Sequence, residues 1–221
     1  MMCDARLFAP QITAFSAERA VMVAPLHAAD TIDALAQAVL RDAPPRFALA
    51  GLSMGGIVAM AVLRQAPERV DRVALLDTNP LAETPERAAE RAPQIERALR
   101  GELRAILRDE MKPHYLAPDS DHKTLLDLCM AMGMSLGPEV FARQSRALRA
   151  RPDHTETLSH SPHPALIACG EHDTLCPLER HTVMRDLMPN ATLTVIADAG
   201  HLPTLENPDA TNAAMSDWLR R

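Results

Sequence analysis

A serine between two glycines places the tightest constraint on how this chain can fold. The apolar run at 47–50 leads into Gly51-Leu-Ser53-Met-Gly55, and a helical pattern begins directly afterwards at Ile57. This order predicts a strand, a sharp turn and a helix, with Ser53 at the apex in a strained backbone conformation. The glycines let strand and helix approach closely. The helix then directs its N-terminal N–H groups and positive dipole end toward any ligand beside Ser53.

Short apolar runs alternate with helical patterns along most of the chain. We predict strands at 19–25, 47–50, 70–77, 164–170 and 191–197. Such alternation is typical of an α/β fold with a mostly parallel central sheet flanked by helices. From 80 to 161 only helical patterns occur, over 89–107, 123–134 and 139–150. We therefore expect a core formed by 1–79 and 162–221, with a helical cap inserted at 80–161. The cap is interpreted as a lid over the ligand crevice or, alternatively, as a helical layer without a gating role.

Two polar residues follow the last two predicted strands, in loops that contain glycine. Asp173 lies in the loop 170–177, and His201 follows the strand at 191–197. Ligands of parallel sheets bind at the carboxyl ends of the strands. The chain order of serine, acid and histidine is also the one expected for a serine in this kind of turn.

These three residue types suit acyl transfer. A serine hydroxyl is a weak nucleophile until a base accepts its proton, which a histidine can do near neutral pH. A buried carboxylate fixes the imidazole tautomer and stabilises the imidazolium. We assign Ser53 as nucleophile, His201 as general base and then acid, and Asp173 as the orienting acid. The backbone N–H of Met54 is assigned as one oxyanion donor.

Each of these residues also fits an ordinary structural role when taken singly. The serine fits a glycine-rich turn, the histidine a helix cap, and the aspartate a solvated loop. The order of the three and their places at strand ends favour the catalytic interpretation. Asp77, which ends the strand at 70–77, is the alternative acid. Its expected role is in a turn or as a helix N-cap before Pro80.

Bulk composition excludes several other classes of function. The net charge is −6 without a basic run, and aromatic residues make up 3% of the chain. Both features argue against nucleic acid or an anionic membrane as a partner. We find no apolar run long enough for a membrane span and no signal-peptide pattern, so we expect a cytoplasmic protein. The four cysteines and nine histidines show no zinc-binding spacing. We therefore expect no metal and no cofactor.

Four motifs together resemble the α/β-hydrolase superfamily, in particular its compact esterase and lactonase branch with a helical cap. They span residues 51–56, 66–77, 170–177 and 200–208. The resemblance covers nearly the whole chain and implies a small-molecule ester or lactone as substrate. The 3-oxoadipate enol-lactonases and small carboxylesterases are the members that it resembles most. The sequence leaves the oligomeric state open.

One departure from the superfamily lies at the N-terminus. Such hydrolases usually begin with further strands and a His-Gly segment, whose loop supplies the second oxyanion N–H. The chain contains no His-Gly dipeptide. We therefore expect an N-terminally shortened fold that lacks the strand beside 47–50. An unpaired inner strand favours aggregation.

These observations predict a serine hydrolase that cleaves an ester, thioester or lactone of a small carboxylic acid through an acyl-enzyme. A C–C bond hydrolase or a cofactor-free perhydrolase with the same triad is a second possibility. A non-catalytic or inactive hydrolase-fold fragment is a third, motivated by the missing His-Gly segment.

Overall fold

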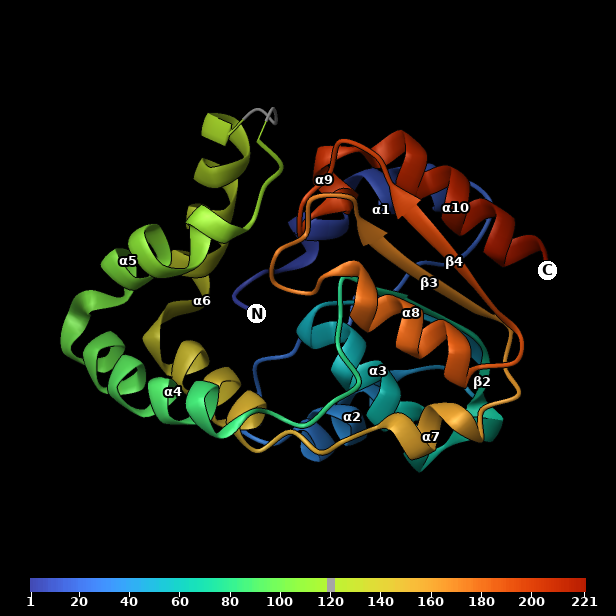
Figure 1. Ribbon diagram of the computed structural model, residues 1–221, viewed down its shortest axis with the longest axis horizontal. Helices are drawn as coiled ribbons and strands as arrows, with labels where there is room; N and C mark the ends of the chain where they lie inside the picture. Colours follow the sequence, from blue (N-terminus) through green and yellow to red (C-terminus); the bar gives the residue numbers. More distant parts are fainter. Residues whose placement is uncertain (119–121) are drawn as a thin grey trace.

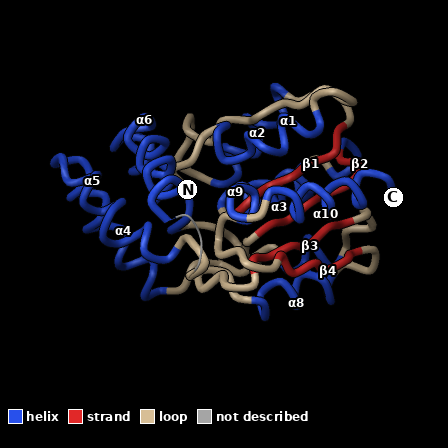
Figure 2. The backbone as a smooth tube through the Cα atoms, turned by 90° about the horizontal axis from the view of Figure 1, so that it is seen from above, coloured by secondary structure: helices blue, strands red, loops and turns tan. Residues whose placement is uncertain are grey.

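Four parallel strands form the central sheet in the computed structural model, which describes residues 1–118 and 122–221. Figure 1 labels β2, β3 and β4, and Figure 2 shows all four strands side by side in chain order. Their bounds are β1 (Phe47–Leu52), β2 (Val70–Leu76), β3 (Ala165–Gly170) and β4 (Ala191–Ile196). All three pairings are parallel. The predicted α/β class with a parallel sheet is therefore confirmed, and all four carboxyl ends meet at one rim.

Helices cover both faces of the sheet (Figure 1). One face carries α2 (Ile32–Asp42), α3 (Met54–Gln65), α7 (Thr155–Ser159) and α8 (Leu178–Leu187). The other carries α1 (Ala9–Phe15) and α10 (Pro208–Arg220), which follows the short α9 (Pro203–Glu206). Along β2, Val73 and Leu75 pack on the first face, whereas Ala74 and Leu76 pack on the second. The strand is apolar at successive positions because both of its faces are buried.

The segment between β2 and β3 is helical and carries an apolar cluster of its own. Its helices are α4 (Pro85–Arg97), α5 (Leu103–Ile106) and α6 (His122–Arg149). Figure 1 shows them beside the sheet rather than on either of its faces. Buried residues from α5, α6 and the adjoining turns pack together, and Met2 from the N-terminus joins them. Single turns of 3₁₀- or π-helix occupy Ala5–Phe8, Pro67–Arg69, Ala98–Glu102, Leu107–Met111 and Lys112–His114.

Two glycines interrupt the helices of this segment. Gly101 has a φ of 102° and separates α4 from α5, so the continuous helix predicted over 89–107 is broken. Gly137 has a φ of 82° inside α6 and is followed by Pro138. A positive φ is accessible to glycine without the steric cost that other residues incur. The two helices predicted at 123–134 and 139–150 are thus joined at this kink.

Helix α6 also meets the length and composition of a bilayer-crossing helix, over Lys123–Arg149. The kink at Gly137 divides it into two parts, and neither approaches the roughly 20 residues that span a bilayer. One helix of suitable length and composition is weak evidence for a membrane span. The absence of a membrane span stays a prediction.

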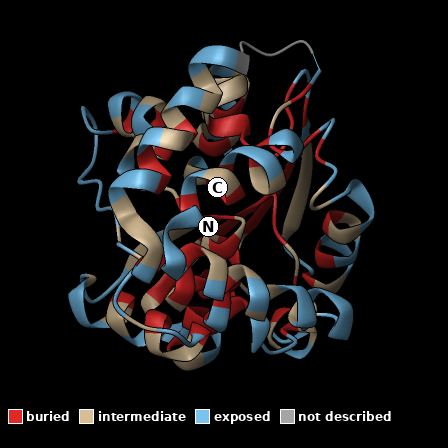
Figure 3. Ribbon diagram, turned by 90° about the vertical axis from the view of Figure 1, so that its left-hand side faces the viewer, coloured by how far each residue is buried: buried red, intermediate tan, exposed pale blue. Residues whose placement is uncertain are grey.

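The strand predicted at 19–25 is wrong. Residues 20–27 have no regular secondary structure, and Val21, Met22 and Val23 are 43%, 49% and 41% exposed. Figure 3 shows that the buried residues lie in the interior of the molecule and the exposed residues on its outside. An apolar run becomes a strand only where a neighbouring strand accepts its backbone hydrogen bonds. Within residues 1–118 and 122–221, no strand pairs with this segment.

Strand β1 forms one edge of the sheet and pairs, in the described part of the chain, only with β2. Just beyond its end, the Ser53 N–H donates to the Leu76 carbonyl at 2.9 Å, in the direction of β2. Backbone groups alternate in direction along a strand, so those of Ala48, Ala50 and Leu52 face away from β2. A row of backbone donors and acceptors is therefore left without a strand partner beside the turn at Ser53.

Candidate active site

Ser53 lies at the sharp turn between β1 and α3, as the sequence predicts. Its φ of 54° and ψ of −118° place a non-glycine residue in a strained conformation. Two contacts from the β2 side fix this turn: its N–H donates to Leu76, and the Thr78 hydroxyl donates to the Ser53 carbonyl at 2.8 Å. A Cβ at Gly51 would lie 2.3 Å from the Gly55 carbonyl oxygen. The first glycine of the motif is therefore required by close packing.

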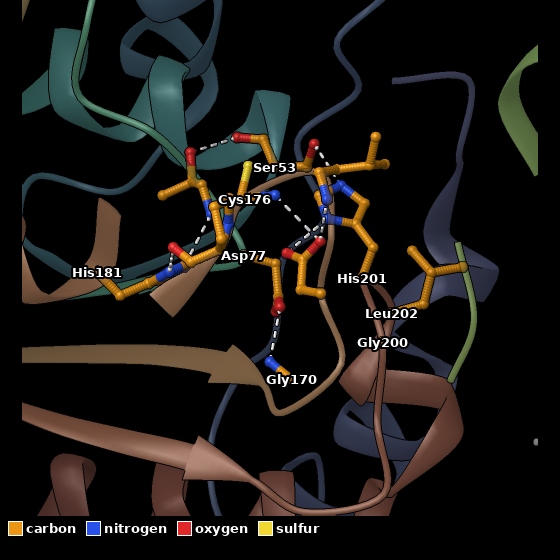
Figure 4. A network of polar contacts seen from close by, with 12 residues as sticks. Ser53, Asp77, Gly170, Cys176, His181, Gly200, His201 and Leu202 are labelled. Carbon is orange, nitrogen blue, oxygen red and sulfur yellow. Dashed lines mark hydrogen bonds and ion pairs between the residues drawn. The ribbon is translucent and has the colours of Figure 1, made fainter. Parts of the chain in front are cut away.

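The structure brings together the three side chains assigned from the sequence (Figure 4). His201 Nε2 lies 2.9 Å from Ser53 Oγ, and His201 Nδ1 lies 2.9 Å from Asp173 Oδ2. Asp173 comes from the loop after β3, and His201 comes from the loop after β4. Residues 120 and 148 positions downstream of the serine thus converge because parallel strands end at one rim.

Asp173 is buried and held as a carboxylate. Its Oδ1 accepts from the N–H groups of Leu175 at 2.8 Å and Cys176 at 3.1 Å, and its Oδ2 faces His201. Burial alone raises the pKa of this carboxyl, but the hydrogen bond and charge of His201 and the two N–H donors outweigh it. The pKa of Asp173 is therefore lowered. An ionised Asp173 favours the imidazole tautomer with its proton on Nδ1.

Glu206, to which the sequence interpretation gave no role, holds the histidine loop in place. Its carboxylate accepts from the N–H groups of Gly200 and Leu202, each at 3.0 Å, and of Ala117 at 2.7 Å. The first two donors flank His201, and the third belongs to the helical segment between β2 and β3. In the sequence, this role is signalled only by an acidic residue five positions after His201.

The helical segment also contacts the histidine loop directly. The His201 N–H donates to the Tyr115 carbonyl at 2.8 Å, and the two rings lie with centroids 6.2 Å apart. A Cβ at Gly200 would meet the Ala117 backbone nitrogen at 2.7 Å. Gly200 therefore lets the 115–117 backbone approach closely, a contact between distant parts of the chain that the sequence does not reveal.

Asp77 does not play the capping role that the sequence suggested. The side chain that caps α4 is Thr84. Asp77 is fully buried with a φ of 44°, and its Oδ1 accepts from the Gly170 N–H at 2.8 Å. Burial, followed by the nearby charge of Asp173, raises its pKa well above the ordinary value. Asp77 therefore lies behind the triad as a buried acid, and His201 pairs with Asp173.

A second polar path supports the serine turn from the side of α8. The Thr78 N–H donates to His181 Nε2 at 3.2 Å, and His181 Nδ1 lies 3.3 Å from the Pro177 carbonyl (Figure 4). Burial lowers the pKa of His181, which fits a neutral ring that accepts at Nε2 and donates at Nδ1. This histidine links the Ser53 turn to the start of α8 and was not recognised from its sequence position.

Met54 is the first residue of α3 and is buried. The first N–H groups of a helix have no acceptor within that helix. The Met54 N–H therefore remains suited to an oxyanion, and its role stays a prediction. The sequence offers no candidate for the second oxyanion donor.

A cavity of about 1540 Å³ opens beside the triad. Ser53 and His201 line it together with the open side of β1, residues 19–27 and Phe141 of α6. Pockets for small ligands usually measure about 300–1,000 Å³. The volume exceeds that range because the space beside β1 and the space over the serine are continuous.

Two clusters in the described part of the chain have the donor atoms to hold a metal ion. Glu171, His172 and Asp198 form an exposed cluster, and Asp173, Cys176 and His201 form one within the triad. Burial and the neighbouring carboxyls raise the pKa of the Cys176 thiol. Cys169 is fully buried, and burial raises its pKa to about 12. The absence of a resident metal stays a prediction.

The chain belongs to the alpha/beta hydrolase family, whose model it matches over residues 5–214. The predicted superfamily is thus confirmed, and the protein is a hydrolase of this class. It is 27% identical over 210 residues to the pimeloyl acyl-carrier-protein methyl ester esterase of Aromatoleum aromaticum, covering 86% of this chain and 80% of that protein.

Solved structures agree with this placement. A thermophilic esterase from Thermogutta terrifontis, with malate bound, superposes with a TM-score of 0.93 at 29% identity, covering 99% of this chain and 86% of its own. The enol-lactonase of Burkholderia xenovorans gives a TM-score of 0.86 at 24% identity, covering 100% of this chain and 88% of its own. The similarity to the enol-lactonase structure shows a shared fold only.

Proposed function

We propose that this protein is a serine hydrolase that cleaves an ester, thioester or lactone of a small carboxylic acid through an acyl-enzyme on Ser53. The observation that carries this proposal is the continuous chain of contacts from Ser53 Oγ through His201 to Asp173, each of 2.9 Å. The distances lie within the reach needed for proton transfer. The esterase names of the relatives support the ester class.

In the first half of the reaction His201 Nε2 accepts the Ser53 hydroxyl proton as Oγ attacks the substrate carbonyl carbon. The carbonyl oxygen gains the negative charge, and the Met54 N–H at the start of α3 donates to it. The dipole of α3 adds to this stabilisation. The tetrahedral species then expels the alcohol or thiol, which takes the proton from His201, and the acyl group stays on Ser53.

In the second half His201 accepts a proton from water, and the resulting hydroxide attacks the acyl carbonyl. The bond to Ser53 Oγ breaks, Oγ regains a proton from His201, and the carboxylic acid leaves. Asp173 keeps the imidazole tautomer correct through both halves. The buried positions of Asp173 and His201 keep these charges away from bulk solvent.

We further propose that the 80–161 segment acts as a cap that borders the acyl pocket. Met111, Leu136 and Phe141 from this segment line the same cavity as Ser53. An apolar wall next to a polar triad suits a substrate with a short apolar acyl chain. The contact of 115–117 with the His201 loop would couple cap position to the base.

The test is turnover of p-nitrophenyl acetate by wild type, Ser53→Ala and the matched control Ser159→Ala. Ser159 is exposed on α7, its hydroxyl donates to the Glu156 carbonyl, and it does not line the cavity. We expect Ser53→Ala to lose on the order of 10⁶-fold in kcat, as for other triad serines, and Ser159→Ala to keep its rate. Full activity of Ser53→Ala would end the proposal.

A fluorophosphonate probe separates this function from an inactive hydrolase fold. The inactive alternative is favoured by the open side of β1 and by the lack of an assigned second oxyanion donor. Labelling of Ser53 in folded protein supports the enzyme. Absence of labelling, with intact thermal unfolding, supports the inactive fold. A panel of ester, thioester, lactone and C–C bond substrates then distinguishes the hydrolase reactions, because the triad is common to all of them.

A further inference from the structure

We propose that Cys176, His201 and Asp173 form a site for a thiophilic divalent cation such as Zn²⁺ or Cd²⁺, and that a cation bound there inhibits the hydrolase. The inhibitory part rests on the function proposed above, whereas the binding site does not. One donor atom from each residue lies within 4.8 Å of the other two. Figure 4 draws Cys176 and His201 in the same network of polar contacts.

The local fold places the thiol here. Asp173 Oδ1 accepts from the backbone N–H groups of Leu175 and Cys176, which closes a tight turn just before Pro177 and α8. This turn brings Cys176 back over the carboxylate that orients His201. The cluster is therefore built by the same hydrogen bonds that hold the acid of the triad.

The three donors suit a thiophilic ion rather than Mg²⁺ or Ca²⁺. Zinc binds thiolate sulfur at about 2.3 Å, imidazole nitrogen at about 2.0–2.1 Å and carboxylate oxygen at about 2.0–2.2 Å. One thiol, one imidazole and one carboxylate leave a fourth position for water. Mg²⁺ and Ca²⁺ instead prefer oxygen ligands throughout.

Both access and charge favour binding. Cys176 and His201 line the large cavity, so an ion from solvent reaches them without unfolding of the protein. Asp173, which is held as a carboxylate, supplies negative charge on the inner side of the cluster. When the ion binds, the Cys176 thiol releases its proton to solvent, and the thiolate charge is neutralised by the metal.

Binding at either ring nitrogen removes the base. A neutral imidazole has one lone pair, and catalysis requires it on Nε2, facing Ser53 Oγ. A cation on Nε2 occupies that lone pair. A cation on Nδ1 displaces the hydrogen bond to Asp173 and leaves the ring proton on Nε2. In both cases His201 cannot accept the proton of Ser53.

The binding test uses Cd²⁺ and a readout independent of turnover. Ser53→Ala keeps all three donors, and its titration is followed by thiolate-to-cadmium charge-transfer absorbance. We expect the absorbance to fall sharply when Cys176→Ala, or the closer isostere Cys176→Ser, is added. Cys169→Ala is the matched control, because Cys169 is fully buried in β3 and does not line the cavity. Equal absorbance with and without Cys176 would overturn the site.

The inhibition test uses Zn²⁺ with p-nitrophenyl acetate, each variant being compared with its own rate without metal. We expect Zn²⁺ to inhibit the wild type, and EDTA to restore the rate. Cys176→Ala removes the sulfur donor and should raise the half-inhibitory Zn²⁺ concentration at least about tenfold. Cys169→Ala keeps all three donors and should leave this concentration unchanged. Unchanged sensitivity of Cys176→Ala would overturn the inhibition. If the site binds Cd²⁺ but the wild type shows no esterase activity in the absence of metal, the site is supported and the proposed function is rejected.

Discussion

The two edges of the sheet differ in a way that bears directly on the active site. The outer strand β4 alternates polar and apolar residues over Ala191-Thr-Leu-Thr, as an edge strand does. The other edge, β1, reads Phe47-Ala-Leu-Ala-Gly-Leu without a polar residue, which is typical of an interior strand. Beyond it lies the apolar and exposed segment 20–24.

The triad depends little on the open side of β1. The Ser53 turn is fixed from the β2 side by Leu76 and Thr78. Asp173 and His201 come from the loops after β3 and β4. The contrast teaches that the three side chains are supported from the paired part of the sheet, whereas the β1 edge borders the cavity.

Among the variants that test this comparison, the largest expected effect shows which acid serves His201. Asp173→Asn should lower kcat for p-nitrophenyl acetate by about 10⁴-fold, because an amide stabilises the wrong imidazole tautomer. Asp77→Asn should change kcat far less, since Asp77 does not contact His201 in the described structure and bonds to Gly170. Equal losses in the two variants would mean that both carboxyls act on the base.

The next effect concerns the stability of the turn. Gly51→Ala places a methyl group 2.3 Å from the rigid Gly55 carbonyl, so we expect destabilisation of at least about 1–3 kcal/mol. Gly55→Ala is the matched control. Its Cβ meets nothing within 4 Å, and alanine favours a helix over glycine by about 1 kcal/mol. Urea unfolding measures both, and similar free energies of unfolding would show that the turn can relax.

Asp77 gives a prediction about pH. Its pKa is raised in the folded state, so the folded protein binds a proton that the unfolded chain releases above about pH 3.9. Stability should therefore fall from that pH upward, until the folded-state pKa is passed. Asp77→Asn, which can still accept from Gly170, should remove this fall and gain stability over wild type as pH rises. Thermal unfolding at pH 5 and pH 8 checks this, and parallel shifts in the two proteins would contradict it.

The smallest effect on activity concerns the open edge itself. Met22→Lys adds a charge to the exposed apolar segment, and we expect less self-association with little change in kcat. Val195→Lys, at an equally exposed position on β4, is the matched control. Concentration-dependent light scattering compares them. A larger improvement from Val195→Lys would place the association at the β4 edge.

The sequence by itself predicted the sharp turn at Ser53, the parallel sheet and the three side chains that the structure brings together. These features depend on local signals: an apolar strand, a glycine-marked turn at Ser53, and polar residues directly after strands. Parallel strands then bring their carboxyl ends together, so Asp173 and His201 could be placed at one rim from sequence order alone.

Tertiary structure decided the rest, because those features depend on neighbours that lie far away in the chain. The run at 19–25 has strand-like residues but lacks a partner, and a strand exists only as part of a sheet. Asp77 accepts from Gly170 at the end of β3, and Glu206 accepts from Ala117 in the distant helical segment. Cys176 lines the cavity because its backbone N–H donates to the Asp173 carboxylate, which holds the two residues together in one turn.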